Sequence, residues 1–273
     1  MVCCLAGIPR SASYRSTGLL DMPGLTTADK QLMRRNGLIM GDDFLTSRQV
    51  VLVVEIAAQD DESYDASLTQ LLAATNISDD ETELIFRWPG VAGREKAQIF
   101  GRVRRRNINM DRQFTFKATV SILFEAGDPR IYSNVISSAA TSVAAQDGGL
   151  EFPLVEPVTF GGVNESGELN ITNSGTFATH AVFRIDGPCT SPRLENVSTG
   201  DVLELDISLS LTDFILVDTN ERQILLNGAA SRYSRLSADS KWFDIAPGLN
   251  TVKYRASTST GSACSVTWRS AYV

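Results

Sequence analysis

A strict alternation of apolar and polar residues in segment 113–126 is the clearest pattern in the chain. Apolar side chains occupy its even positions: Phe114, Phe116, Ala118, Val120, Ile122 and Phe124. The odd positions are polar, with Leu123 as the exception. Because successive side chains of a strand point to opposite faces, this pattern predicts a long, half-buried strand of an antiparallel sheet.

Three further segments of the first half also predict strands. Residues 48–58, RQVVLVVEIAA, are more uniformly apolar, which predicts a strand covered on both faces. Residues 82–88 and 97–106 continue the series.

One helical pattern interrupts the strands. Leu68, Leu71, Leu72 and Thr75 are spaced i, i+3, i+4, i+7, which predicts an amphipathic helix that begins after a cap at Ser63 or Asp65. The segment 26–37, TTADKQLMRRNG, predicts a second, short helix that ends at its glycine.

The composition changes near residue 130. Residues 131–150 are rich in Ser and Ala, and short apolar segments then alternate with turn signals such as ESG, NSG, STG and NG. This punctuation is typical of an all-β sandwich. We therefore predict two domains, 1–130 and 131–273. The first carries 16 basic and 17 acidic side chains and the second 9 and 15, so most of the net charge of −7 belongs to the second.

The composition argues against several classes of function. A net charge of −7 disfavours non-specific nucleic-acid binding as the main role. No run of about 18 apolar residues occurs, so we expect no membrane insertion. The four cysteines lack metal-ligand spacing, His180 is the only histidine, and no phosphate-binding glycine loop occurs. We expect no cofactor, no metal and no enzyme, although a glycosidase would need only two carboxylates and stays open as an alternative.

Two blocks of charge stand out. Residues 60–83 hold eight acids and no base, and Asp79, Asp80 and Glu81 lie among them. Residues 94–112 hold seven bases against two acids. Strand alternation places Arg102, Arg104 and Arg106 on one face, about 6–7 Å apart. Three interpretations stay open: two solvated surfaces, a basic stripe that contacts nucleic acid, or two complementary halves of a repeated subunit interface.

Several stretches, in this order, resemble one family. They are NSGTFATHAVFRIDGP (173–188), FILVDTNERQILLNG (214–228), KWFDIAPGLNTVKYRA (241–256) and the closing SVTWRSAYV. Together they resemble the C-terminal galectin-like domain of the distal tail protein (Dit) family of long-tailed, siphovirus-type bacteriophages. Residues 18–56 and 127–133 resemble the N-terminal ring-forming domain of that family.

The resemblance implies a mainly β fold, with an N-terminal β barrel or sandwich that is similar to tail-tube subunits and carries one helix. It implies a structural virion protein that forms a homohexameric ring at the tail tip, assembled in the bacterial host cytoplasm. Its expected partners are the tail tube protein, the tail hub and other tail-tip proteins, and viral DNA passes transiently through the ring.

The resemblance also gives residues 242–248 a structural role. Trp242 and Phe243 would close the sandwich, and Pro247-Gly248 would turn the chain into the next strand.

A carbohydrate-binding module that recognises host cell-wall glycans is the alternative function. A galectin-like sandwich can present a sugar groove, but fold alone does not establish that function. Its candidate stacking residues are Tyr233, Trp242 and Trp268.

Overall fold

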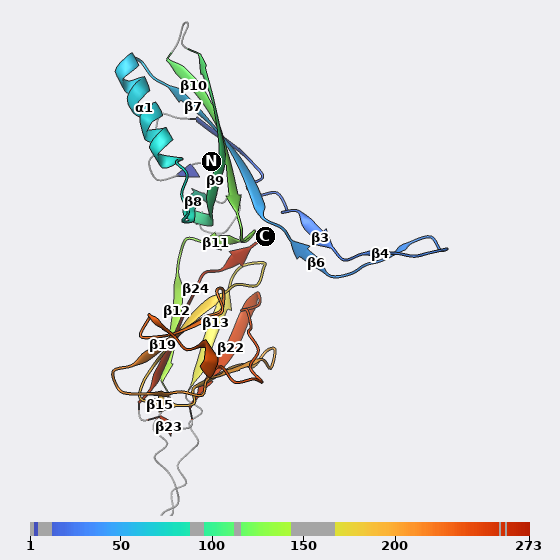
Figure 1. Ribbon diagram of the computed structural model, residues 1–273, viewed down its shortest axis with the longest axis vertical. Coiled ribbons are helices and arrows are strands. Elements are labelled where there is room, and N and C mark those ends of the chain that lie inside the picture. The colour runs from blue at the N-terminus through green and yellow to red at the C-terminus, as the bar shows by residue number, and fades with distance from the viewer. Residues whose placement is uncertain are drawn as a thin grey trace, which may run out of the picture. The chain divides into compact units, whose positions relative to one another are not determined.

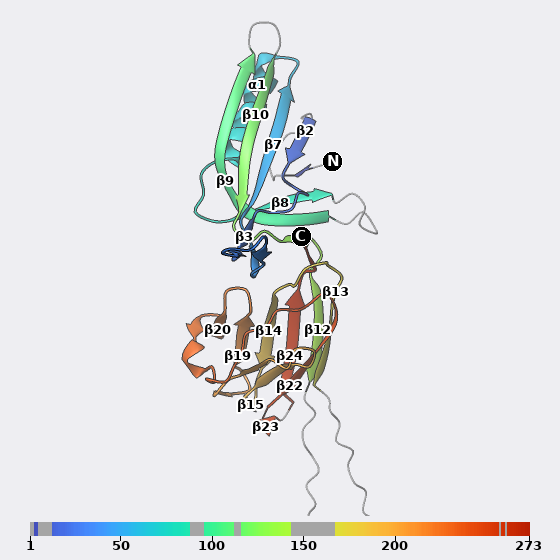
Figure 2. The same ribbon diagram turned by 90° about the vertical axis from the view of Figure 1, so that its right-hand side faces the viewer.

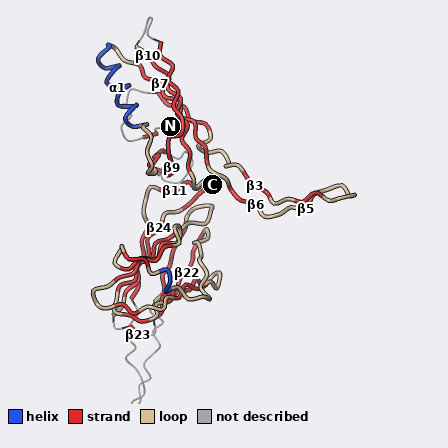
Figure 3. Tube along the Cα trace, viewed as in Figure 1, coloured by secondary structure: helices blue, strands red, loops and turns tan. Residues whose placement is uncertain are grey.

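The structure is a computed structural model, and it describes residues 3–4, 13–87, 96–111, 116–142, 167–256, 258–259 and 261–273. The chain divides into two compact units. Unit 1 comprises Met1–Asn134 together with Tyr272–Val273, and unit 2 comprises Val135–Ala271. Strands dominate both units (Figure 3), so the predicted mainly β fold is confirmed.

An antiparallel sheet forms the body of unit 1 (Figure 2). Its strands, in spatial order, are β1 (Cys3–Cys4), β8 (Thr82–Arg87), β9 (Lys96–Asp111), β10 (Lys117–Ala126), β7 (Arg48–Ala57) and β2 (Ser13–Thr17). A short strand, β11 (Ile131–Ser133), also pairs with β9. The neighbouring strands β7, β10 and β9 pair over most of their lengths, which gives the unit a continuous sheet.

The alternation predicted for the central strand is confirmed in β10. All its even positions from Ala118 to Ala126 are buried. Phe114 lies outside the described residues, and Phe116 lies before the strand with a side chain that is 40% exposed. The prediction for β7 is wrong, because its burial alternates and Val51 is 36% exposed. One face of this sheet is therefore covered and the other carries partly exposed apolar residues.

Helix α1 (Asp61–Ala74) covers the buried face, alongside β10 and β7 (Figure 1). Its Tyr64 and Leu71 are fully buried in the core of unit 1. The predicted caps are wrong by a few residues, because Asp60 caps the helix and its carboxylate accepts a hydrogen bond of 2.7 Å from the Ser63 amide. That hydrogen bond lowers the pKa of Asp60.

A hairpin arm occupies the segment for which the sequence predicted a second helix. Its outer part pairs β4 (Lys30–Gln31) with β5 (Leu38–Ile39), and its inner part pairs β3 (Leu25–Thr27) with β6 (Asp43–Leu45). The arm extends away from the sheet of unit 1 (Figure 1). The helix prediction is wrong because residues 32–37 form the loop that reverses the chain between β4 and β5, with Arg34 at φ +68° and Gly37 at φ +121°, both outside the helical region.

Unit 2 consists of antiparallel sheets that enclose a second core. The largest sheet contains, in spatial order, β12 (Ser137–Ser142), β24 (Ala263–Trp268), β14 (Ala181–Asp186), β19 (Phe214–Asp218), β20 (Gln223–Leu226) and β21 (Ala230–Ser231). The second contains β13 (Glu168–Asn173), β22 (Gly248–Arg255), β16 (Arg193–Asn196) and β17 (Val202–Glu204). A third contains β18 (Ser208–Leu209), β15 (Cys189–Thr190) and β23 (Thr258–Ser259). The last strand, β25 (Ala271–Tyr272), spans the boundary between the two units along the chain.

The segment 241–256 has a structural role in unit 2. Phe243 is buried and meets Phe183 edge-on, with ring centroids 6.0 Å apart. Gly248, at φ +93°, then leads the chain into β22. From this strand, Val252 and Tyr254 are buried in the core of unit 2.

Candidate interaction surfaces

The three arginines proposed from strand alternation do not share a face. In the register between β9 and β10, Val103 faces Phe124 and Arg105 faces Leu123, so Arg104 is the extra residue of a β-bulge. One inserted residue reverses the alternation on either side of it. Arg102 therefore lies on the outer face of the sheet and Arg106 on the face that α1 covers, which corrects the prediction.

Arg106 belongs to the internal structure of unit 1. Its Nη1 donates hydrogen bonds to the Leu72 carbonyl at 3.0 Å, the Thr75 carbonyl at 3.4 Å and the Thr75 hydroxyl at 2.7 Å. These acceptors form the C-terminal end of α1, where the helix itself carries no basic residue in its last turn. A cation at this end satisfies carbonyls that lack a helical partner and complements the helix dipole.

Arg104 is paired on the outer face. Its Nε donates to Glu125 Oε2 at 3.0 Å, and the same carboxylate accepts hydrogen bonds from Gln49 and Ser47. The hydrogen bond from Gln49, followed by those from Ser47 and Arg104, lowers the pKa of Glu125. The exposed Arg105 and the half-buried Arg102 have no carboxylate partner in the part of the chain that the structure describes.

The three acids proposed for the complementary surface are exposed. Asp79, Asp80 and Glu81 lie in the loop between α1 and β8. Within the described ranges, no ion pair joins them to the arginines of β9. Within one copy of the chain, the described residues of the acidic loop and of the basic strand therefore do not pair with each other. The interpretation that they form two complementary halves of a subunit interface stays a proposal.

The hairpin arm and the segment that enters it expose many apolar side chains, a feature that the sequence analysis did not predict. Among the described residues, 18 large apolar side chains are exposed, and eight of them fall within only 25 residues of this segment: Leu20, Met22, Leu25, Met33, Leu38, Ile39, Met40 and Phe44. A concentration of exposed apolar residues of this kind makes the arm a candidate interaction surface. The Asn36-Gly37 turn signal, together with apolar residues that follow no helical spacing, could have indicated it.

Arg48 fixes the base of the arm. Its guanidinium is 1% exposed and donates to the carbonyls of Leu19 at 3.1 Å, Asp21 at 2.6 Å and Pro129 at 2.8 Å. Burial lowers the pKa of Arg48. The segment that enters the arm is thus tied to the body of unit 1 by a buried, charge-assisted network.

The aromatic candidates for sugar stacking have different environments. Trp268 is 7% exposed and its Nε1 donates to the Thr172 carbonyl at 3.0 Å, so it is a core residue and the prediction for it is corrected. Trp242 is half-buried and stacks on Tyr233, with ring centroids 6.4 Å apart. Tyr233, 51% exposed, is the most accessible ring of the three.

The only histidine of the chain, His180, contacts an acid. His180 Nδ1 lies 3.0 Å from Asp244 Oδ1, a hydrogen-bond contact that its sequence surroundings did not predict. In the described part of the chain, no group of three His, Cys, Asp or Glu side chains could hold a metal ion. Within the same ranges, no helix is long and apolar enough to span a membrane.

The second half of the chain matches a known protein family. Residues 174–272 match the family model described as the siphovirus-type tail component, C-terminal domain. This confirms the resemblance that was predicted from the stretches between residues 173 and 273. No curated protein matches the chain.

Solved structures extend the likeness to nearly the whole chain. One is the SPP1 Dit (gp 19.1) protein, described as a paradigm of the hub adsorption apparatus in Gram-positive-infecting phages; it matches 95% of this chain and 92% of its own, with 11% identity and a TM-score of 0.63. A chain of the phage P2 baseplate in its activated conformation with Ca matches 94% of this chain and 90% of its own, with 11% identity and a TM-score of 0.53. A chain of the same baseplate with Sr matches 94% of this chain and 90% of its own, with 10% identity and a TM-score of 0.51. At these identities the likeness establishes the fold.

Proposed function

We propose that the protein is a structural component of a phage tail tip. It forms a homohexameric distal ring that joins the tail tube to the baseplate and leaves a channel for DNA. The observation that carries this proposal is the fold match over 95% of the chain to a hub protein of phage adsorption. The proposed partners are further copies of the chain, the tail tube protein and the proteins of the tail hub, and the proposed location is the virion. We assign it no catalytic activity.

The hairpin arm supports self-assembly. A two-stranded hairpin is at best marginally stable alone in water, and this one has little core of its own. Burying a fully exposed Met, Leu or Phe side chain contributes about 1.5–3 kcal/mol. The four most exposed of the eight are 65–94% exposed, so covering them would contribute roughly 5–9 kcal/mol before the cost of association. Ring contacts are heterologous, and each subunit therefore presents an arm and a surface that receives it.

The exposed charges supply a second, weaker contribution. In a ring, the acidic loop with Asp79, Asp80 and Glu81 meets the basic outer face that includes Arg102 and Arg105 on the next copy. Single exposed pairs contribute about 0–1 kcal/mol, so these charges select the orientation of neighbours more than they hold them together. If the arginines line the channel instead, reversing them leaves assembly unchanged and impairs only DNA passage.

Labelled electron microscopy of virions tests the proposed location. Antibody against unit 2, applied to intact particles of the virus that encodes this chain, should label the end of the tail away from the capsid. Label on the capsid or along the whole tube, or absence of the chain from purified virions by mass spectrometry, contradicts the proposal. Antibody against the major tube protein is the control, because it should label the whole tube.

A further inference from the structure

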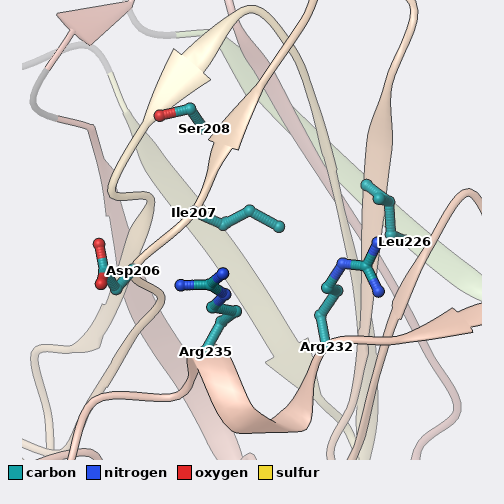
Figure 4. A pocket seen from close by; sticks show the side chains of 6 residues that line it. All are labelled: Asp206, Ile207, Ser208, Leu226, Arg232 and Arg235. Carbon is teal, nitrogen blue, oxygen red and sulfur yellow. The ribbon is translucent and has the colours of Figure 1, made fainter.

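An open hollow of about 420 Å³ lies on unit 2 (Figure 4). It is lined by Asp206, Ile207, Ser208, Leu226, Arg232 and Arg235, and we call it the arginine hollow. Its size lies within the range of small-molecule sites, about 300–1,000 Å³. The structural role proposed above does not use this hollow.

Backbone hydrogen bonds hold the two arginines in place. Arg232 directly precedes the 3-10 helix η1 (Tyr233–Arg235), and Arg235 is the last residue of that helix. The entry to η1 is fixed by a bond of 2.7 Å from the Arg232 amide to the Ile224 carbonyl. Its exit is fixed by a bond of 2.8 Å from the Asp206 amide to the Arg235 carbonyl. Two elements that are distant in sequence are thereby joined at the hollow, and these bonds fix the backbone from which its lining side chains project.

The guanidinium groups are available to an anion. Arg232 Nη1 donates to the Ser231 carbonyl at 3.1 Å, which leaves its other donors for a ligand. Neither Arg232 nor Arg235 forms an ion pair with a carboxylate within the described ranges. Asp206 is the one acid in the lining, so the lining carries a net charge of +1. Arginine forks match the oxygens of a phosphate in geometry as well as in charge.

The remaining lining residues suit a different part of the same ligand. The Asp206 carboxylate lies at the edge of the hollow, on the side away from Arg232 (Figure 4), where it can accept hydrogen bonds from hydroxyl groups. The Ser208 hydroxyl points to the same side and donates to the Thr190 hydroxyl at 3.5 Å. Ile207 and Leu226 add aliphatic surface, which matches the C–H face of a sugar or polyol. A bare inorganic anion would gain nothing from Asp206 or the aliphatic side chains, and a neutral sugar would gain little from two arginines. We propose that the arginine hollow binds a phosphate-bearing sugar or polyol.

This inference stands apart from the proposed tail-tip ring. It goes beyond the carbohydrate alternative of the sequence analysis, because it places the ligand at Arg232 and Arg235 and gives it a phosphate group. A failure to bind ligand would leave ring formation untouched, and a monomeric protein that binds ligand would leave this inference intact.

The test uses the full-length protein and a panel of defined probes. Glucose 1-phosphate and glycerol 1-phosphate are titrated by saturation-transfer NMR and calorimetry, beside glucose, glycerol, inorganic phosphate and acetate. A poly(glycerol phosphate) oligomer and a DNA oligonucleotide of equal phosphate number separate the two sources of phosphodiester. The variants are Arg232→Gln and Arg235→Gln. Arg255→Gln is the matched control, because it removes the same charge from an exposed position on β22 of the same unit.

The proposal predicts that the sugar or polyol phosphate binds about ten-fold or more tightly than inorganic phosphate or the neutral sugar. Each hollow variant should lose about ten-fold or more in affinity, and Arg255→Gln should lose none. The melting temperatures of all variants should match that of the wild type, because only side-chain tips are changed.

Four results would overturn the proposal: no saturable binding of the phosphorylated probes at tens of millimolar, equal loss in Arg255→Gln, inorganic phosphate or acetate binding as tightly as the sugar phosphate, or DNA binding more tightly than the polyol phosphate polymer. If a hollow variant fails to fold, the wild-type probe series and saturation-transfer contacts to the sugar protons still decide the question.

Discussion

Replacing Arg106 should destabilise the C-terminal end of α1 and should not disturb a subunit interface. Its Nη1 serves three acceptors at the helix C-terminus, at 2.7, 3.0 and 3.4 Å. A hydrogen bond from a charged group contributes about 1.5–3 kcal/mol, and a cation at a helix C-terminus adds about 0.3–1 kcal/mol. Because Arg106 is half-buried, we expect Arg106→Gln to cost about 2 kcal/mol. Arg106→Glu should cost about 3 kcal/mol, since it places a negative charge beside carbonyl oxygens.

Hydrogen exchange measured by mass spectrometry reports this loss locally. When exchange follows the opening equilibrium, 2 kcal/mol corresponds to roughly 30-fold faster exchange of the amides that open with the helix. Peptides covering residues 64–75 should show this acceleration in Arg106→Gln, and peptides of unit 2 should not. Arg105→Glu is the matched control, because Arg105 is adjacent, exposed and without a carboxylate partner in the described part of the chain. Unchanged exchange of α1 in Arg106→Glu, or equal acceleration in Arg105→Glu, would refute the reasoning.

Three further substitutions test separate parts of the structure. Arg48→Met should lower the free energy of unfolding of unit 1 by about 3 kcal/mol, measured by urea titration, because it leaves buried carbonyls without donors; Arg48→Lys should recover only part of it. Trp268→Ala should destabilise unit 2 by about 3–5 kcal/mol, and a retained melting temperature would contradict its place in the core. Because the pKa of Glu125 is lowered in the folded state, its contribution is present above its ordinary pKa of about 4.3 and is lost as pH falls through the folded value. The stability difference between wild type and Glu125→Gln should therefore shrink below about pH 4, and a constant difference would contradict the hydrogen-bonded carboxylate.

Local patterns in the sequence predicted the elements whose side chains follow one period. The alternation from Ala118 to Ala126 gave the burial of β10 residue by residue, because a half-buried strand leaves its period in the sequence. Leu71 likewise marked the buried face of α1. These elements obey a single physical rule along their lengths.

The predictions failed where a bulge or the tertiary packing overrode the local pattern of the strand. The bulge at Arg104 separates Arg102 from Arg106, and no property of an arginine-rich strand announces which residue will be left unpaired. The uniform apolar run of 48–58 predicted two covered faces, but Val51 is 36% exposed. Coverage of a face is a tertiary property that the strand itself does not record.

The residues of the candidate surfaces also depend on tertiary packing, which the local sequence pattern does not record. Trp268 and Tyr233 are both aromatic residues of a β domain, and only the packing distinguishes a core ring from an exposed one. The arginine hollow joins residues 206–208 to 226–235, and this juxtaposition depends on backbone bonds that sequence spacing does not reveal. The arm differs from these cases, because the sequence contains a hairpin signal at Asn36-Gly37 although the segment was predicted to be a helix.

The mass of the protein in solution tests the central claim most directly. Six copies of a 29.7 kDa chain give about 178 kDa, and light scattering coupled to size exclusion should return this mass for the wild type at micromolar concentration. Replacing Met33, Met40 and Phe44 by Ser should shift the mass toward 29.7 kDa with each unit still folded, because these arm side chains are 94%, 84% and 65% exposed in a single copy. A wild-type protein that stays at 29.7 kDa at high concentration, with no ring at the tail tip of intact virions, would contradict the account.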